Sequence, residues 1–106
     1  MNYTKEQIID IAKQVMQDLD GRFYRESSVD IKPFFYKRKL YKDGISKNDT
    51  IDSWLLSIKT IGDNEDSLYI SDETGEPIFY QNFNTFVFDI VKNSNGKYEL
   101  KDIDLR

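Results

Sequence analysis

The chain has 106 residues, of which 39% are hydrophobic and 32% charged, with a formal net charge of −4 at pH 7. This length is that of one domain, and the aromatic share of 14% argues against disorder, because disordered chains lack large rings that drive burial. The absence of His and Cys excludes Ser–His–Asp and Cys–His nucleophilic units and the usual ligands of zinc and copper. We therefore expect one domain over residues 1–106 that is not an enzyme, with no catalytic residue, no cofactor and no metal.

The negative charge is concentrated in the second half of the chain. Residues 1–53 carry 10 basic and 9 acidic side chains (+1), whereas residues 54–106 carry 5 and 10 (−5). Such an asymmetry is typical of a binding face. Because the sequence has no Cys, no signal peptide and no apolar run of about 20 residues, we expect a cytoplasmic protein without a membrane partner.

The first predicted element is a helix over residues 5–20. Thr4 and Gln7 have the spacing of a capping box, and Gly21 follows the last apolar turn, where a left-handed cap favours glycine. The apolar residues between them recur with the helical period of one buried stripe: Ile8, Ile9, Ile11, Ala12, Val15, Met16 and Leu19.

After Gly21 the pattern changes to the alternation of strands. A short strand at 29–31 is interrupted by Pro33, and the aromatic residues of 34–41 predict a second strand. Residues 51–61 form a third, with Trp54, Leu56 and Ile58 on one face and Ser53, Leu55, Ser57 and Lys59 on the other.

The remaining strands are separated by turns that contain glycine or acidic residues. Residues 62–66 predict a turn, 67–71 a strand, 72–75 a hairpin turn with Gly75, and 77–81 the returning strand. Phe86, Phe88 and Ile90 alternate in the next strand, and a turn at 93–96 leads to the last one at Tyr98 and Leu100. The order predicts an α+β fold, in which the N-terminal helix packs on a curved antiparallel meander sheet of five to six strands.

Two acidic turns are the first candidate site. Their carboxylates, which could dock a basic partner, are Asp63, Glu65, Asp66, Asp72, Glu73 and Glu76. The same pattern fits a solvated acidic end of a sheet, and the spacing lacks the alternating oxygen ligands of a calcium loop.

A basic aromatic stretch at 32–47 is the second candidate. Lys37, Arg38 and Lys39 are interleaved with Phe34, Phe35, Tyr36 and Tyr41, as in single-stranded nucleic-acid binders. An edge strand protected by lysines has the same composition, and a protein-docking surface is a further interpretation. An acidic protein binds polyanions poorly, so nucleic acid is not the expected partner.

Trp54 is the single tryptophan of the chain. Its place on an apolar strand face favours a core position. Alternatively, Trp54, Phe86 and Phe88 would line a pocket for a small apolar ligand in the hollow of a curved sheet.

The order of these motifs resembles that of small cystatin-like and NTF2-like domains, including PepSY-type modules and bacterial toxin-immunity proteins. A Trp-centred strand is followed there by a hairpin with an ID-x-x-TG-E-I pattern, and the matching residues over 4–82 are Trp54, Leu56, Ile70, Asp72, Thr74, Gly75, Glu76 and Ile78. The resemblance implies a binding domain, and immunity proteins of this group neutralise a toxin by covering its active site.

The leading hypothesis is thus a non-enzymatic protein-binding domain, an immunity or inhibitor protein whose partner is a protein such as a basic toxin domain. A ligand-binding domain with a pocket at Trp54 and a nucleic-acid module at 32–47 are the alternatives. The sequence predicts no oligomeric state.

Overall fold

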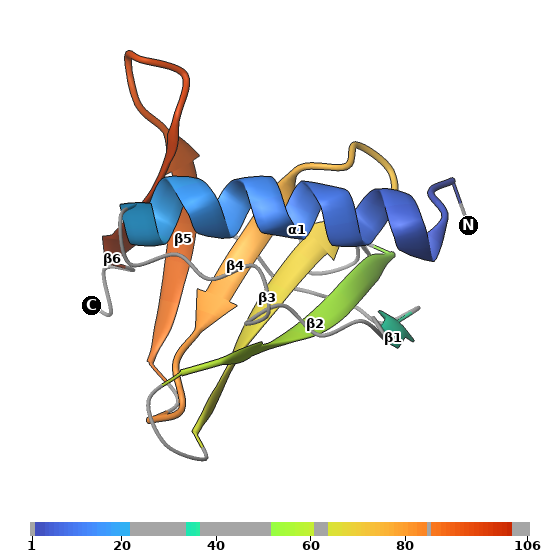
Figure 1. Ribbon diagram of the computed structural model, residues 1–106, viewed down its shortest axis with the longest axis horizontal. Helices are drawn as coiled ribbons and strands as arrows, with labels where there is room; N and C mark the ends of the chain where they lie inside the picture. Colours follow the sequence, from blue (N-terminus) through green and yellow to red (C-terminus); the bar gives the residue numbers. More distant parts are fainter. Residues whose placement is uncertain (1, 22–33, 37–51, 61–63, 85, 103–106) are drawn as a thin grey trace, which may run out of the picture.

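The computed structural model describes residues 2–21, 34–36, 52–60, 64–84 and 86–102 (Figure 1). Within them the chain forms a helix followed by strands. The elements are α1 (Lys5–Asp20), β1 (Phe34–Tyr36), β2 (Ser53–Lys59), β3 (Glu65–Ser71), β4 (Pro77–Gln81), β5 (Val87–Lys92) and β6 (Tyr98–Asp102).

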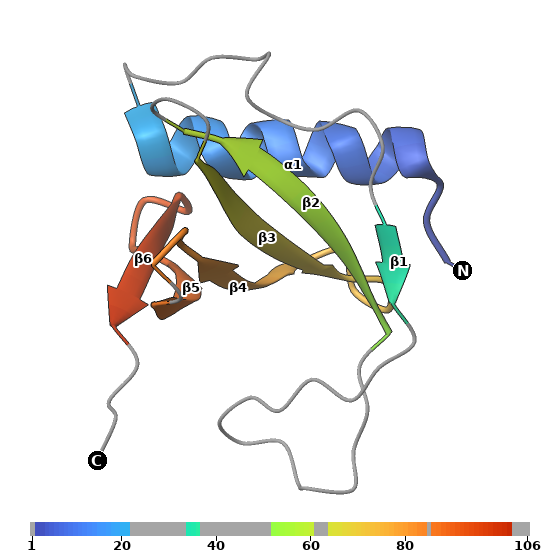
Figure 2. The same ribbon diagram turned by 90° about the horizontal axis from the view of Figure 1, so that it is seen from below.

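The described strands form one antiparallel sheet in the order β1-β2-β3-β4-β5-β6. Each of the five strands β2 to β6 lies beside its neighbour in sequence, which makes a meander, and the short β1 pairs with the outer edge of β2. Helix α1 crosses one face of the sheet, and the strands twist beneath it (Figures 1 and 2). The α+β prediction, with the N-terminal helix on an antiparallel meander, is confirmed.

Helix α1 begins and ends where the sequence predicts. The Thr4 hydroxyl accepts a hydrogen bond from the Gln7 N–H (3.1 Å), and the Gln7 side chain accepts one from the Thr4 N–H (2.8 Å). Gly21 ends the helix with φ 55°, a conformation that residues with a Cβ rarely adopt. The helix buries Ile8, Ala12, Val15 and Met16, which lie on one face because of their spacing.

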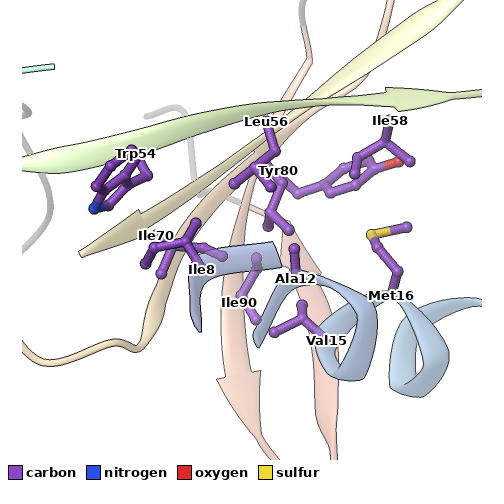
Figure 3. Close-up of a cluster of buried hydrophobic side chains, with 11 residues drawn as sticks. Ile8, Ala12, Val15, Met16, Trp54, Leu56, Ile58, Ile70, Tyr80 and Ile90 are labelled. Carbon is purple, nitrogen blue, oxygen red and sulfur yellow. The ribbon is translucent and has the colours of Figure 1, made fainter. Parts of the chain in front are cut away.

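The core lies between this helical face and the inner face of the sheet. The strands contribute Trp54, Leu56, Ile58, Leu68, Ile70, Tyr80 and Ile90. In Figure 3 Trp54 lies near Ile8 and Ile70 at one end of the cluster, while Met16 lies toward Ile58 at the other. The alternation that predicted one buried face of β2 is therefore confirmed.

Two details of the strands differ from prediction. Glu65 and Asp66 belong to β3 and not to a turn, because Asp66 is buried and hydrogen-bonded within the sheet. Ser53, predicted on the outward face, is also fully buried where β2 lies between β1 and β3. The pairing of β3 with β4 shifts between Tyr69 and Ile70, so that Pro77, at the first position of β4, lies opposite Ile70.

Other predictions fall outside the described residues: the strand at 29–31, the part of the 34–41 strand after Tyr36, and the first two residues of the turn at 62–66. As for membrane insertion, α1, the helix within the described ranges, lacks the length and apolar character that a membrane span requires.

Candidate functional site

The β3–β4 turn carries the second acidic group of the sequence, and its first residue, Asp72, is buried. Only 2% of Asp72 is exposed. Its carboxylate accepts hydrogen bonds from the Trp54 indole N–H (2.9 Å) and from the backbone N–H groups of Asn2 (2.7 Å) and Tyr3 (3.2 Å). Asp72 therefore joins the segment before α1 to the inner face of β2.

These donors set the charge state of Asp72. Burial by itself would raise the pKa of this carboxyl, but the hydrogen bonds from Trp54, Asn2 and Tyr3 favour the ionised form and hold the pKa below its usual range. The folded structure therefore favours the ionised form of the Asp72 carboxyl.

The rest of the turn is held by short-range hydrogen bonds. The Ser71 hydroxyl accepts from the N–H groups of Glu73 (3.1 Å) and Thr74 (3.3 Å), and the Gly75 N–H donates to the Ser71 carbonyl (3.0 Å). Gly75 has φ 71°, and a Cβ there would lie 2.8 Å from the Tyr3 ring. These contacts define the shape of the turn, in which Glu73 is exposed.

The first acidic group lies at the opposite end of β3 and is built around Asp66, which is 8% exposed. The Tyr80 hydroxyl donates to Asp66 Oδ2 (2.5 Å), and the Phe83 N–H donates to Asp66 Oδ1 (2.9 Å). Asp66 thereby connects the start of β3 to the loop that follows β4.

The environment of Asp66 raises the pKa of two neighbours. Burial, followed by the hydrogen bond to Asp66 and its charge, raises the pKa of Tyr80. The Asp20 side chain at the end of α1 also has a raised pKa, first from partial burial and then from the negative charge of Asp66. The two ends of β3 therefore each hold a buried carboxylate that accepts hydrogen bonds from other parts of the chain.

The structure separates the predicted acidic site into buried and exposed members. Asp66 and Asp72 are buried, Glu65, Glu73 and Glu76 are exposed, and Asp63 lies outside the described residues. The predicted positions do not converge on one cluster, because the two groups lie at opposite ends of β3.

Glu76 has contacts with the far edge of the sheet. The Tyr98 hydroxyl donates to Glu76 Oε2 (2.6 Å), and the Lys92 ammonium lies 3.8 Å from Glu76 Oε1 and 5.2 Å from the centre of the Tyr98 ring. Burial and the Glu76 carboxylate raise the pKa of Tyr98. Its backbone N–H donates to Asp18 of α1 (3.2 Å), so that β6 is fastened to the helix.

The sequence also predicted two alternative sites, the basic residues at 37–39 and a pocket lined by Trp54, Phe86 and Phe88. Lys37, Arg38 and Lys39 lie outside the described residues. Trp54, of which 1% is exposed, is a core residue whose indole N–H is taken by Asp72. Phe88 packs against the same core, but Phe86 lies before β5 with 60% of its surface exposed, so these three side chains are not brought together.

The sequence analysis missed Phe83, which is also exposed on the β4–β5 loop. A weak signal was present, since the segment 82–86 places two phenylalanines among asparagine and threonine, which favour loops.

Among the residues that the structure describes, no group of three acidic or other metal-binding side chains could hold a metal ion. The chain matches no family model, no curated protein and no solved structure.

Proposed function

We propose that this chain is a non-enzymatic protein-binding domain, an immunity or inhibitor protein that neutralises a toxin by covering its active site. The resemblance of the Trp-centred strand and the D-E-T-G-E turn to those of cystatin-like and NTF2-like immunity proteins supports the proposal. The partner is a basic protein, because the chain carries a net charge of −4.

The observation that carries the proposal is the fixed acidic turn between β3 and β4. The Ser71 hydroxyl and the buried Asp72 carboxylate accept hydrogen bonds that hold the turn in place, while Glu73 is exposed. A carboxylate on a rigid turn loses little conformational entropy on binding, and it attracts a basic surface through its charge. Residues 71–73 thus include both the groups that hold the turn, Ser71 and Asp72, and the exposed carboxylate of Glu73.

The test is co-purification with the product of the adjacent gene, followed by an activity assay of that product. We expect a one-to-one complex that resists moderate salt and in which the partner's activity is lost. A partner that remains fully active in the complex, or an adjacent product that does not bind, would overturn the proposal.

A matched pair of charge reversals identifies the surface. Glu73→Lys places a positive charge on the exposed turn, and Asp10→Lys places the same change on the exposed face of α1. We expect Glu73→Lys to weaken the complex about tenfold or more, chiefly through slower association, and Asp10→Lys to change it less than about threefold.

A further inference from the structure

The β4–β5 loop exposes two large aromatic side chains. Phe83 and Phe86 have 51% and 60% of their surfaces exposed, whereas Trp54 and Phe79 are buried and Phe88 packs against the core. The loop lies at the end of the sheet away from the N-terminus (Figure 1). A pair of exposed rings close together in sequence favours an interaction surface over chance exposure.

The fold holds this loop in place from beneath. The Asn82 side-chain oxygen accepts from the N–H groups of Asn84 (2.9 Å) and Phe86 (3.0 Å), and the Asn82 N–H donates to the Phe86 carbonyl (2.9 Å). The buried Asp66 accepts from the Phe83 N–H (2.9 Å). These hydrogen bonds hold the backbone at Phe83 and at Phe86, and residues held in this way lose less conformational entropy on binding, as interface anchors do.

The surroundings of the loop are negatively charged. Ser67 pairs with Gln81 in the antiparallel β3–β4 pairing. The loop that follows Gln81 therefore lies beside the residues that precede Ser67, which are Glu65 and Asp66. Glu65 is exposed, and Asp20 at the end of α1 is close enough to Asp66 that the negative charge of Asp66, after partial burial, raises the pKa of Asp20. Among the described residues, the strand register also places a basic side chain near the loop, because Lys59 pairs with Glu65 in the sheet.

We infer that Phe83 and Phe86 are the apolar anchors by which this chain binds a basic protein surface, a surface that joins apolar pockets to lysine or arginine side chains. The inference rests on the proposed function and adds to the Glu73 turn a second contact region, at the opposite end of β3. The carboxylates beside the loop oppose an anionic lipid surface or nucleic acid, and the net charge of −4 opposes a second copy of this acidic chain.

The experiment places the photo-crosslinker p-benzoylphenylalanine at position 83, 86 or 100 of the chain, expressed in the cells that make it. Leu100 on β6 is the matched control, because it is an exposed apolar residue (41%) on another part of the sheet. We expect positions 83 and 86 to capture one protein with an isoelectric point above about 9, and position 100 not to capture it. Mass spectrometry identifies the captured protein.

Titration of that purified protein then measures the contribution of the rings. We expect the double variant Phe83→Ser, Phe86→Ser to weaken binding at least about thirtyfold and Leu100→Ser to change it less than about threefold. Unchanged thermal unfolding of the double variant shows that it still folds, as the exposure of both rings leads us to expect.

The outcomes separate this inference from the proposed function. Crosslinks to an acidic protein, to a second copy or to nothing overturn the inference, as does an unchanged affinity of the double variant. If the captured basic protein needs both rings but keeps its activity when bound, the inference stands and the immunity function fails. If the partner is inhibited but binds the double variant normally, the function stands and the inference fails.

Discussion

The two ends of β3 look alike in sequence and differ in structure. Each has a run of acidic residues, and at each end one aspartate is buried while a neighbouring glutamate is exposed. Burial raises the pKa of Asp72, but Asp72 accepts hydrogen bonds from an indole and two backbone N–H groups, and these hold its pKa below the usual range. Asp66 accepts hydrogen bonds from a phenol and one N–H, and its charge adds to partial burial in raising the pKa of Asp20. The comparison teaches that a run of acidic residues can contain a buried carboxylate that stabilises the fold next to an exposed one that is free to meet a partner.

The largest effect is expected at the Asp72 end. Asp72→Ala leaves the buried Trp54 indole N–H and the N–H groups of Asn2 and Tyr3 without their acceptor, so we expect a loss of about 3 kcal/mol in the free energy of unfolding. Chemical denaturation measures it. Glu73→Ala, one residue further along and exposed, is the control, with a change within about 0.5 kcal/mol. Equal losses in both variants would contradict the division into structural and surface carboxylates.

A pair of glycine substitutions tests how closely the same end is packed. Gly75 and Gly96 both have positive φ (71° and 78°), but a Cβ at Gly75 would meet the Tyr3 ring at 2.8 Å, and one at Gly96 would meet nothing within 4 Å. We expect Gly96→Ala to cost about 1 kcal/mol from backbone strain and Gly75→Ala about 2 kcal/mol. Thermal or denaturant unfolding compares the two, and a smaller cost at Gly75 would disprove the close approach of Tyr3.

The Asp66 end is expected to respond less. Tyr80→Phe removes the hydroxyl that donates to Asp66, while the Phe83 N–H still donates, so we expect a loss of about 1 kcal/mol in stability. Tyr98→Phe removes a hydroxyl of the same kind from an exposed hydrogen bond to Glu76, and its cost should be below about 0.5 kcal/mol. If the two variants lose equal stability, burial does not strengthen the Tyr80–Asp66 hydrogen bond.

The smallest effect is the pH dependence, in which the two ends act in opposite directions. The pKa of Asp72 in the folded state lies below its ordinary value of 3.8, so its stabilisation is present above that value and is lost as pH falls through the folded pKa. The pKa of Asp20 lies above 3.8, so its favourable contribution is present at low pH and is lost as pH rises through the folded pKa.

Denaturation of two asparagine variants between about pH 2 and pH 6 measures these contributions. Asp72→Asn should flatten the rise of stability with pH below 3.8, and Asp20→Asn should remove a small fall above it. A decrease in stability with rising pH that persists in Asp20→Asn would show that another group is responsible.

Local sequence determined the elements and much of their order. The capping box of Thr4 and Gln7 and the spacing of the apolar stripe define α1, and alternation defines the inner faces of the strands, because both signals arise from neighbouring residues. Gly75 and Gly96 were likewise readable as turn positions, since a positive φ is a local requirement.

Only the tertiary structure decided which acidic and aromatic residues are buried. Asp72 and Glu73 are equivalent by local pattern, but the donors of Asp72 come from residues 18 to 70 positions away, at Trp54 and Asn2. Asp66 accepts hydrogen bonds from Tyr80 and Phe83, which lie 14 and 17 positions away in the sequence. Phe86 continues the alternation of Phe88 and Ile90, yet it is exposed because it precedes β5, in a loop closed by Asn82. Burial depends on such distant contacts, which the periodicity of a single segment does not contain.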